Sequence, residues 1–422
     1  MLPTMLKGKM AGVALLAALV AIGSAPAAVQ AAPPAQVGAG PKVTLNTNWP
    51  KALPNNWQLG PLTGIYGDNH GLVWTSNQSN HLGDYDLSQD LGTGTCCTMA
   101  PQIIAFDQAG NVVKSWSVSV PPPKPPRNPN AAFQAPVMAG AKTYPTTCPG
   151  FKCLSNVHTV YVDSKDNVWV VGNGRGDSHI LKFDYNGKFL LQIGGDNSPG
   201  VGGNQDQNNL GAGGQGGGTG IAYWPATNEV FLTDGYVNRR VIVFDADTGK
   251  FKRMWGAYGK QPQPSVRDEK SGEMVSPKPT RVFEGPGAPE FDTVHGVSIT
   301  PDGVVWVADR VGNRIQQFKV DGTFIREVFV SRKSTNGTGT VYGFSFSRDP
   351  AMKYVYIADG GNKTVHILDR VSLQEVGSFG GCGGQMPGCF NPVHVSATDP
   401  AGNVYTGEAA AGARIQRWDV AK

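Results

Sequence analysis

Short runs of β-branched and aromatic residues, separated by turns rich in Gly, Asp and Asn, recur along most of the chain. The clearest example is VHGVSITPDGVVWVADRVGNRIQQFKVDGTF, where three such runs follow one another within residues 294–324. Runs of this length and composition predict β-strands, and the repeats show no helical apolar period of useful length. Five further copies of the pattern begin at Leu62, Val157, Thr219, Val341 and Val393. We therefore expect an all-β protein built of six repeats.

Each repeat holds three to four short strands, which is the size of one blade of a β-propeller. Six four-stranded blades around a central channel would account for nearly the whole chain beyond residue 42. The last repeat stops after its third strand, at Trp418, so we expect the segment Val43–Asn48 to supply its outer strand. Such closure removes an open sheet edge. The predicted fold is a six-bladed β-propeller over residues 43–422.

The N-terminal segment has the organisation of a secretory signal peptide. Lys7 and Lys9 precede an apolar run from Met10 to Ile22, and small residues at 29–31 offer a cleavage site. This run is shorter than the ~20 residues that a membrane-spanning helix needs, so a cleaved signal is favoured over an anchor. We predict a signal peptide over residues 1–31, a linker over 32–42, and a secreted or periplasmic mature protein without a transmembrane segment.

Composition and charge narrow the classes of function. The chain has 56 glycines, 31 prolines and only 16% charged residues, which excludes a coiled coil, and its 40% hydrophobic residues exclude a disordered protein. The formal net charge is +4, without a run of basic residues. No nucleic-acid partner is therefore expected. We expect a monomer that takes a small-molecule or peptide substrate.

The six cysteines of an exported chain are expected to form disulfides. Cys382 and Cys389 bracket a Gly/Pro-rich loop and make the simplest pair. No CxxC spacing occurs, which argues against a cysteine zinc site. For the remaining four we expect Cys96 and Cys97 to pair with Cys148 and Cys153, although the sequence does not fix this connectivity.

Three of the seven histidines share one register of the repeat. His158, His295 and His394 each follow a Val, and each stands 11 residues before the aromatic residue of the second strand. Those aromatic residues are Trp169, Trp306 and Tyr405, and the equivalent positions of the other three repeats are Thr63, Gly220 and Tyr342. Histidine therefore marks alternate blades.

This register falls at the start of the first strand of each repeat. Because the first strand of a blade lines the channel, three imidazoles should converge on the axis. Three neutral imidazole nitrogens with an open fourth position are the pattern of a catalytic zinc site, and the alternative is inheritance from a duplicated ancestor. The four other histidines have no partners in register and are expected at the surface or in turns: His70, His81, His179 and His366.

Two residues just past a second strand are candidates for catalysis. Tyr236 stands in Thr-Asp-Gly-Tyr and Arg310 in Ala-Asp-Arg, where the loops of a propeller open onto one face. An arginine suits bidentate capture of a carboxylate, and a tyrosine beside a cationic metal can act as a base. The alternative for each is a packing or surface role. Three aspartates at one nearby register are better explained as structural groups that bind turn amides: Asp234, Asp309 and Asp359.

The repeats resemble NHL repeats, and their arrangement resembles the peptidyl-α-hydroxyglycine α-amidating lyase family. The segments that carry the resemblance are SNVHTVYVDSKDNVWVV, LTDGYVNRRVIVFD, TVHGVSITPDGVVWVADRVGNRIQQF and NPVHVSATDPAGNVYTGE. The resemblance implies a six-bladed propeller in which His158, His295 and His394 hold zinc, Tyr236 is the base and Arg310 binds the substrate carboxylate. The implied reaction cleaves the N–Cα bond of a peptidyl-α-hydroxyglycine to a peptide amide and glyoxylate.

The chain departs from that family at several positions. The family's first-blade arginine is absent, since residues 75–78 read Thr-Ser-Asn-Gln, and Arg175 and Arg239 are the candidates to replace it. The family's calcium uses an aspartate directly after the third histidine, where this chain has Val395, so calcium is not carried over. Pro392 and Val237 stand where the family has Met and Cys. These differences indicate a divergent branch with an altered pocket.

Two other functions stay open from the sequence. A non-catalytic exported NHL propeller could bind a protein or a glycan, and it would have no need of three convergent histidines. A hydrolase similar to the propeller lactonases would need Glu, Asn and Asp around calcium, and no such channel set is visible. Because resemblance of fold does not fix chemistry, another small α-hydroxy acid is also a candidate substrate.

Overall fold

The computed structural model describes residues 40–82, 96–119, 147–174, 176–195, 203–211, 216–270, 272 and 274–421. The chain divides into two units, Met1–Ala32 and Pro33–Lys422, and all described residues belong to the second. The predicted signal peptide and linker at residues 1–39 therefore lie outside the described residues. Within the described part, no helix is both long and apolar enough to span a membrane.

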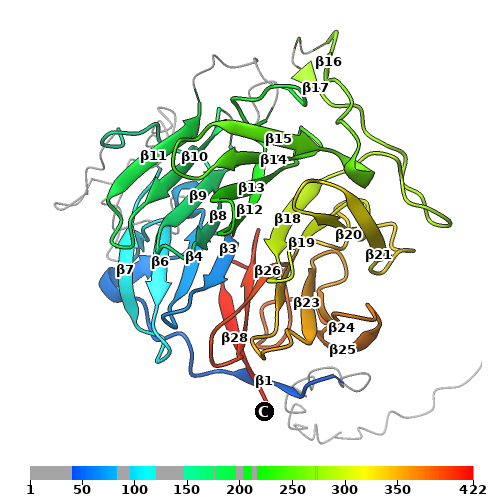
Figure 1. The fold of residues 1–422 in the computed structure, drawn as a ribbon. Helices are drawn as coiled ribbons and strands as arrows, with labels where there is room; N and C mark the ends of the chain where they lie inside the picture. The colour runs from blue at the N-terminus through cyan, green and yellow to red at the C-terminus, as the bar shows by residue number, and fades with distance from the viewer. Residues whose placement is uncertain are drawn as a thin grey trace, which may run out of the picture. The chain divides into compact units, whose positions relative to one another are not determined.

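Six four-stranded antiparallel sheets form the blades, and their strands follow one another from the channel outward (Figure 1). The first blade holds β3 (Leu62–Gly67), β4 (Val73–Asn77), β6 (Ile103–Phe106) and β7 (Val112–Trp116). The second holds β8 (Val157–Val162), β9 (Val168–Gly172), β10 (His179–Phe183) and β11 (Phe189–Gly194). The third holds β12 (Gly218–Trp224), β13 (Glu229–Asp234), β14 (Arg240–Asp245) and β15 (Phe251–Trp255).

The remaining three blades repeat this order. The fourth holds β18 (Val294–Ile299), β19 (Val304–Asp309), β20 (Arg314–Lys319) and β21 (Phe324–Phe329). The fifth holds β22 (Gly343–Phe346), β23 (Tyr354–Asp359), β24 (Thr364–Asp369) and β25 (Glu375–Gly380). The sixth holds β26 (Val393–Thr398), β27 (Val404–Glu408) and β28 (Ile415–Val420), completed by β1 (Val43–Asn46).

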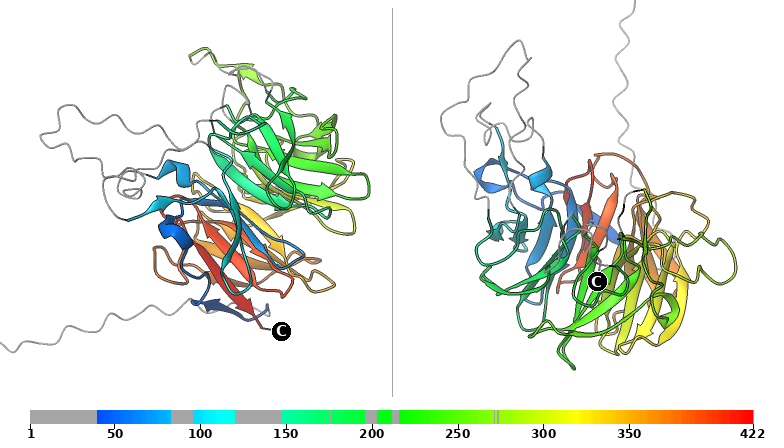
Figure 2. Two further views of the ribbon diagram at one scale, coloured as in Figure 1. Left: turned by 90° about the vertical axis from the view of Figure 1, so that its left-hand side faces the viewer. Right: turned by 90° about the horizontal axis from the view of Figure 1, so that it is seen from above.

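The ring closes as the sequence predicts. The inner strands neighbour one another in the order β3, β8, β12, β18, β22, β26 and again β3. Strand β1 pairs antiparallel with β28, with Val43 opposite Val420 and Asn46 opposite Arg417. Figure 2 shows the blue β1 beside the red strands of the sixth blade. This pairing covers the edge that the last repeat would otherwise leave open.

Short elements lie outside the blades. Strands β2 (Trp57–Gln58) and β5 (Thr98–Met99) pair in parallel, and β16 (Val266–Arg267) pairs with β17 (Met274–Val275) between the third and fourth blades. Three single 3₁₀ turns complete the described elements: η1 (Pro54–Asn56), η2 (Ser79–His81) and η3 (Ala257–Gly259).

The hydrophobic core is divided among the junctions between blades. One cluster joins Trp169 and Val171 of the second blade to Ile221 and Leu232 of the third, all at most 4% exposed. Apolar faces of neighbouring sheets therefore bury one another, which is how β-branched repeats stabilise a ring.

The aromatic residue of the second strand is tied to the turn that precedes it. Trp74 Nε1 donates to Asp68 Oδ2 at 2.7 Å, and Trp169 Nε1 donates to Asp163 Oδ2 at 2.8 Å. The same aspartates accept backbone N–H groups of their own turns, as Leu72 and Asn167 show. In these two blades the turn aspartate thus ties the second strand to the turn before it, whereas Trp306 Nε1 of the fourth blade has no such partner in the described structure.

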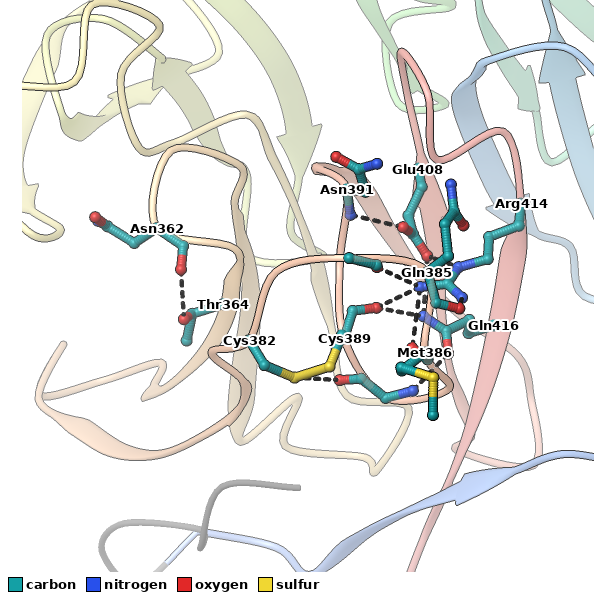
Figure 3. Close-up of a disulfide and its surroundings, with 12 residues drawn as sticks. Asn362, Thr364, Cys382, Gln385, Met386, Cys389, Asn391, Glu408, Arg414 and Gln416 are labelled. Atoms are coloured by element: carbon teal, nitrogen blue, oxygen red, sulfur yellow. Dashed lines mark hydrogen bonds and ion pairs between the residues drawn. A yellow bond between two sulfur atoms is a disulfide. The ribbon is translucent and has the colours of Figure 1, made fainter. Parts of the chain in front are cut away.

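The disulfides correct part of the sequence prediction. Cys382 pairs with Cys389, as expected, with Cα atoms 4.8 Å apart (Figure 3). Cys148 pairs instead with Cys153, with Cα atoms 5.3 Å apart, and Cys96 with its neighbour Cys97. The predicted cross-pairing was wrong because each cysteine has a partner within five residues, so no long loop needs to close.

Two histidines that we expected at the surface or in turns lie within strands, His179 buried and His366 partly buried. His179 in β10 is fully buried and bonds the carbonyl oxygen of Lys152 at 2.8 Å. His366 in β24 lies 3.1 Å from Asp359 Oδ2 and 2.9 Å from Glu375 Oε1. His70 is exposed beside Asp166, as expected.

Candidate metal centre

Each of the three predicted metal ligands occupies a β-bulge. In the second blade Val157 pairs with Gly172 and Thr159 with Val171, which leaves His158 without an opposing residue. The same irregularity places His295 and His394 out of the ladder of their own blades. A bulge turns a side chain away from the regular alternation of the strand. The three imidazoles accordingly line the cavity along the channel.

The three side chains meet, as the sequence predicts. One ring nitrogen from each of His158, His295 and His394 lies within 4.8 Å of the others, and the ring centroids are 4.8 to 5.1 Å apart. The residues are 1%, 3% and 4% exposed. They are the one group of His, Cys, Asp or Glu side chains with metal-site spacing among the residues that the structure describes.

A carbonyl oxygen of the next blade fixes the tautomer of each imidazole. His158 Nδ1 donates to Thr219 O and His394 Nδ1 donates to Thr63 O, both at 2.9 Å. His295 Nδ1 donates in the same way to Tyr342 O. Because Nδ1 carries the proton, the lone pair lies on Nε2. Metal-binding histidines make this kind of second hydrogen bond.

The electrostatic surroundings keep the imidazoles neutral. Burial, together with the charge of Arg310, lowers the pKa of His158 to about 3 despite its bond to Thr219. Burial and the charge of Arg310 also hold the pKa of His295 well below its usual value. The pKa of His394 is also held well below its usual value, mainly by burial and then by the neighbouring His158 and Arg310. Neutral imidazole is the form that binds a metal ion.

The donor set fits a metal ion that prefers nitrogen ligands. Three Nε2 lone pairs converge, and the phenol of Tyr236 has one proton to share between two of them. His394 Nε2 makes no hydrogen bond to any described residue. Three imidazoles with room for a further ligand match catalytic zinc, whereas calcium prefers oxygen ligands. The residues present therefore fit zinc.

Tyr236 lies at the histidines. Its hydroxyl is 3.1 Å from His158 Nε2 and 3.0 Å from His295 Nε2. Burial raises the pKa of Tyr236, while the charge of Arg310 and hydrogen bonds from Arg310 and Asn173 oppose that rise. The phenol is thus protonated at neutral pH unless a further positive charge lies beside it.

Arg310 reaches the same point from the fourth blade. Its Nη1 is 3.3 Å from both the Tyr236 hydroxyl and His295 Nε2, and its Nε donates to Thr338 O at 2.8 Å. The guanidinium lies 4.3 Å from the ring centroid of Tyr342. Its Nη2 bonds no described residue. Arg310 can therefore offer Nη2 to a substrate carboxylate. The bidentate contact that the sequence predicts is restricted, because Nε and Nη1 already make hydrogen bonds within the protein.

Asn173 is a site residue that the sequence analysis missed. Its backbone N–H donates to Asn156 O just as that of Arg310 donates to Thr293 O, so the two residues are equivalent in their blades. Asn156 Nδ2 donates to Asn173 Oδ1 at 2.8 Å, which leaves the Asn173 amide group to donate to Tyr236. The position directly after a second strand, which singled out Arg310, could have found it.

The structure corrects one equivalence in the histidine register. The third blade presents Thr219, not Gly220, at the bulge. Ala222 pairs with Phe231, nine residues on, whereas Ser298 of the fourth blade pairs with Trp306, eight residues on. Because this hairpin is one residue longer, counting 11 residues back from Phe231 gives Gly220, one residue after the bulge.

Of the two arginines considered as replacements for the absent first-blade arginine, the structure describes Arg239 alone, and its contacts lie elsewhere. Arg239 is 3% exposed and donates to Ser276 O and Asp292 Oδ1, away from the histidines. Arg175 lies outside the described residues. In the first blade Gln78 donates instead to Val157 O at 3.0 Å.

A cavity of about 690 Å³ extends from the three histidines along the channel. Its wall is formed by the six inner strands, and it includes Thr63, Thr219 and Tyr342 at the histidine end. This volume is within the usual range for small-molecule sites.

The fold and this centre define a six-bladed propeller with three converging histidines that could hold a metal ion. Residues 291–318 match the family model of the NHL repeat. A segment of 175 residues, 40% of the chain, is 31% identical to peptidylglycine alpha-amidating monooxygenase of Rattus norvegicus, and equally so to the enzyme of Mus musculus. The chain matches only 14% of the length of these relatives.

Two solved structures align with most of this chain at low sequence identity. A streptogramin B lyase aligns over 90% of this chain and 98% of its own, with 13% identity and a TM-score of 0.47. A virginiamycin B lyase from Staphylococcus aureus, with quinupristin, aligns over 90% and 87% at 13% identity and a TM-score of 0.45.

Proposed function

We propose that the protein is an exported zinc-dependent lyase that cleaves the N–Cα bond of an α-hydroxyglycine-type substrate. The observation that carries this proposal is the position of the Tyr236 hydroxyl, 3.1 and 3.0 Å from two neutral histidine nitrogens. A base at that point is within reach of a hydroxyl group bound among the three imidazoles. The partial identity to the amidating enzymes supports the choice of substrate.

His158, His295 and His394 would hold the metal through Nε2. When bound, zinc would supply Lewis-acid polarisation of the substrate hydroxyl and a positive charge that favours the Tyr236 phenolate. Arg310 Nη2 would bind the substrate carboxylate.

The reaction is balanced without a co-reactant. Tyr236, as its phenolate, would take the proton of the α-hydroxyl, the electron pair left on that oxygen would form the C=O bond of glyoxylate, and the N–Cα bond would break with its electron pair going to nitrogen. The leaving nitrogen would gain a proton and become the amide. Arg310 Nη1 donates to the Tyr236 oxygen at 3.3 Å and would stabilise it once it has lost its proton, and the nearby Asn173 amide would act in the same direction.

The test is product analysis with N-benzoyl-α-hydroxyglycine. Zinc-loaded mature protein should release benzamide and glyoxylate in equal amounts, above the rate without protein. His295→Ala should abolish the excess, whereas His70→Ala, a control at an exposed histidine outside the site, should not. Wild-type protein that matches the protein-free rate would contradict the lyase proposal and favour a binding propeller.

A further inference from the structure

The channel has a second arginine at the end away from the histidines. Arg348 follows the inner strand β22, whereas Tyr342, at the histidine level, precedes it. At about 3.3 Å per residue, roughly five residues of strand separate the two levels by about 16 Å. Arg348 nevertheless lines the same cavity as the three histidines. The cavity therefore extends from the three histidines at one end to Arg348 at the other.

Arg348 is partly buried without a carboxylate partner. Its Nη2 donates to Gly67 O at 2.5 Å and to Thr398 O at 3.2 Å, which are backbone groups of the first and sixth blades. No ion pair joins it to any acidic residue in the described ranges. The fully buried arginines differ, since Arg240 pairs with Asp234 and Arg314 with Asp309. A guanidinium removed from water normally has an anionic partner.

The adjacent acidic residue does not fill this role. Asp349 accepts hydrogen bonds from Ser347 Oγ and from the backbone N–H groups of Ala351 and Lys353, all within its own turn. These bonds lower the pKa of Asp349 although burial opposes them. Its carboxylate is therefore committed to the turn, and the charge of Arg348 remains available to the cavity.

Two tyrosines stand beside Arg348 in the cavity wall. The rings of Tyr66 and Tyr161 are 4.6 Å apart, and the side chains of Arg348 and Tyr161 lie close enough to the Tyr66 hydroxyl to influence its pKa. Burial raises the pKa of Tyr66, so the phenol keeps its proton at neutral pH. A guanidinium and a phenolic O–H within one cavity are donors of the kind that bind a carboxylate.

We propose that Arg348 and Tyr66 form a second binding site, for the carboxylate of a small organic acid, inside the channel at the end opposite the histidines. The cavity volume limits the ligand to a small molecule, and the neighbouring wall residues Ile299 and Phe346 give its remainder an apolar surface. This site does not depend on the lyase reaction, because its residues are distinct from Tyr236 and Arg310.

Calorimetric titration of the mature protein with glycolate, and with the neutral isostere glycolamide, tests the site. Glycolate should bind and glycolamide should not. Tyr66→Phe, which leaves Arg348 and its carbonyl partners in place, should weaken glycolate binding about tenfold through loss of one bond to a charged group. Arg348→Lys should weaken it further, since the planar fork is lost. Arg326→Met, at an exposed arginine of an outer strand, is the matched control and should bind as wild type.

The Arg310→Lys variant distinguishes the two ends of the channel. Glycolate binding that persists in Arg310→Lys and is weakened by Tyr66→Phe supports the site, whether or not the protein has lyase activity. Binding that disappears in Arg310→Lys would place the carboxylate at the histidines and overturn the proposal. Wild-type affinity in both Tyr66→Phe and Arg348→Lys, or no binding to the wild type, would also overturn it.

Discussion

His158 donates from Nδ1 to the carbonyl oxygen of Thr219 at 2.9 Å, and both residues occupy the bulge position of their blades. The next contact around the ring is of another kind: Thr219 Oγ1 donates to Val294 O at 2.8 Å, next to His295. The even-numbered blades provide the imidazoles, and the odd-numbered blades provide the carbonyl oxygens that accept from them. The backbone of one blade orients the histidine of the preceding blade, so the arrangement of the three imidazoles depends on the assembled ring.

Tyr236→Phe tests the role of the phenol. The substitution removes the oxygen that lies within 3.1 Å of two histidine nitrogens and leaves the ring in place. We expect zinc content to stay unchanged and turnover to fall by a factor of about 10² to 10⁴, the usual contribution of a general base. Steady-state kinetics beside metal analysis decide the matter, and unchanged turnover would remove Tyr236 from the mechanism.

Gly360→Ala tests the support behind Arg310. A Cβ at Gly360 would lie 2.7 Å from the Tyr342 ring and 2.6 Å from Val393 O. The ring would have to move from its place 4.3 Å from the guanidinium of Arg310. We expect a loss of about 1–3 kcal/mol in the free energy of unfolding, the usual cost of overpacking, and a raised KM.

Gly337→Ala is the control for that substitution, since a Cβ there meets no atom within 4 Å. Denaturant unfolding of the two variants should differ by the stated amount. Equal stability of both would show that the Tyr342 ring can move without cost, and it would contradict a role for that ring in holding Arg310.

His366 should make stability depend on pH above neutrality. Burial lowers the pKa of His366, but hydrogen bonds to Asp359 and Glu375 outweigh it and raise the pKa to about 9. Because the folded-state value exceeds the unfolded value of about 6.5, this stabilisation is complete below pH 6.5 and is lost as the pH rises through 9. It amounts to about 1–3 kcal/mol. His366→Gln should flatten the decline in unfolding free energy between pH 7 and 9, and an unchanged slope would contradict the assignment.

The fold could be predicted because each repeat contains the turn and strand residues that determine its own hairpins. Turn residues such as Asp68 and Asp163 and the aromatic residues that they bind recur at fixed spacing, so the hairpins follow from local sequence. The closing strand at Val43–Asn46 followed from the count of strands, since a ring leaves one strand missing.

The convergence of the three histidines was also predictable, because a shared register becomes a shared level along the channel. Thr219 was missed because a hairpin longer by one residue shifts the register, which spacing alone does not reveal. Asn173 was missed although it holds the same position after a second strand as Arg310, whereas Arg348 was missed because its contacts are with blades that are distant in sequence. His366 was misjudged because its acidic partners, Asp359 and Glu375, come from the two neighbouring strands.

The disulfide pairing was open from the sequence for a different reason. Four cysteines allow three connectivities, and the order of the chain favours none of them. In the structure the loop closed by Cys382 and Cys389 is fixed further by Arg414, which donates to Cys389 O at 2.6 Å, as Figure 3 shows. This support comes from the residue just before β28, whereas the disulfide loop lies between β25 and β26, so the spacing of the cysteines does not reveal it.

The most direct test of the central claim is elemental analysis of the purified mature protein beside the triple variant His158→Ala, His295→Ala, His394→Ala. The account predicts about one zinc per chain in the wild type, none in the variant, and a similar far-ultraviolet circular dichroism spectrum for both, because the blades have their own cores. Wild-type protein that contains no zinc and does not take it up when it is added would contradict the metal centre and the lyase mechanism built on it.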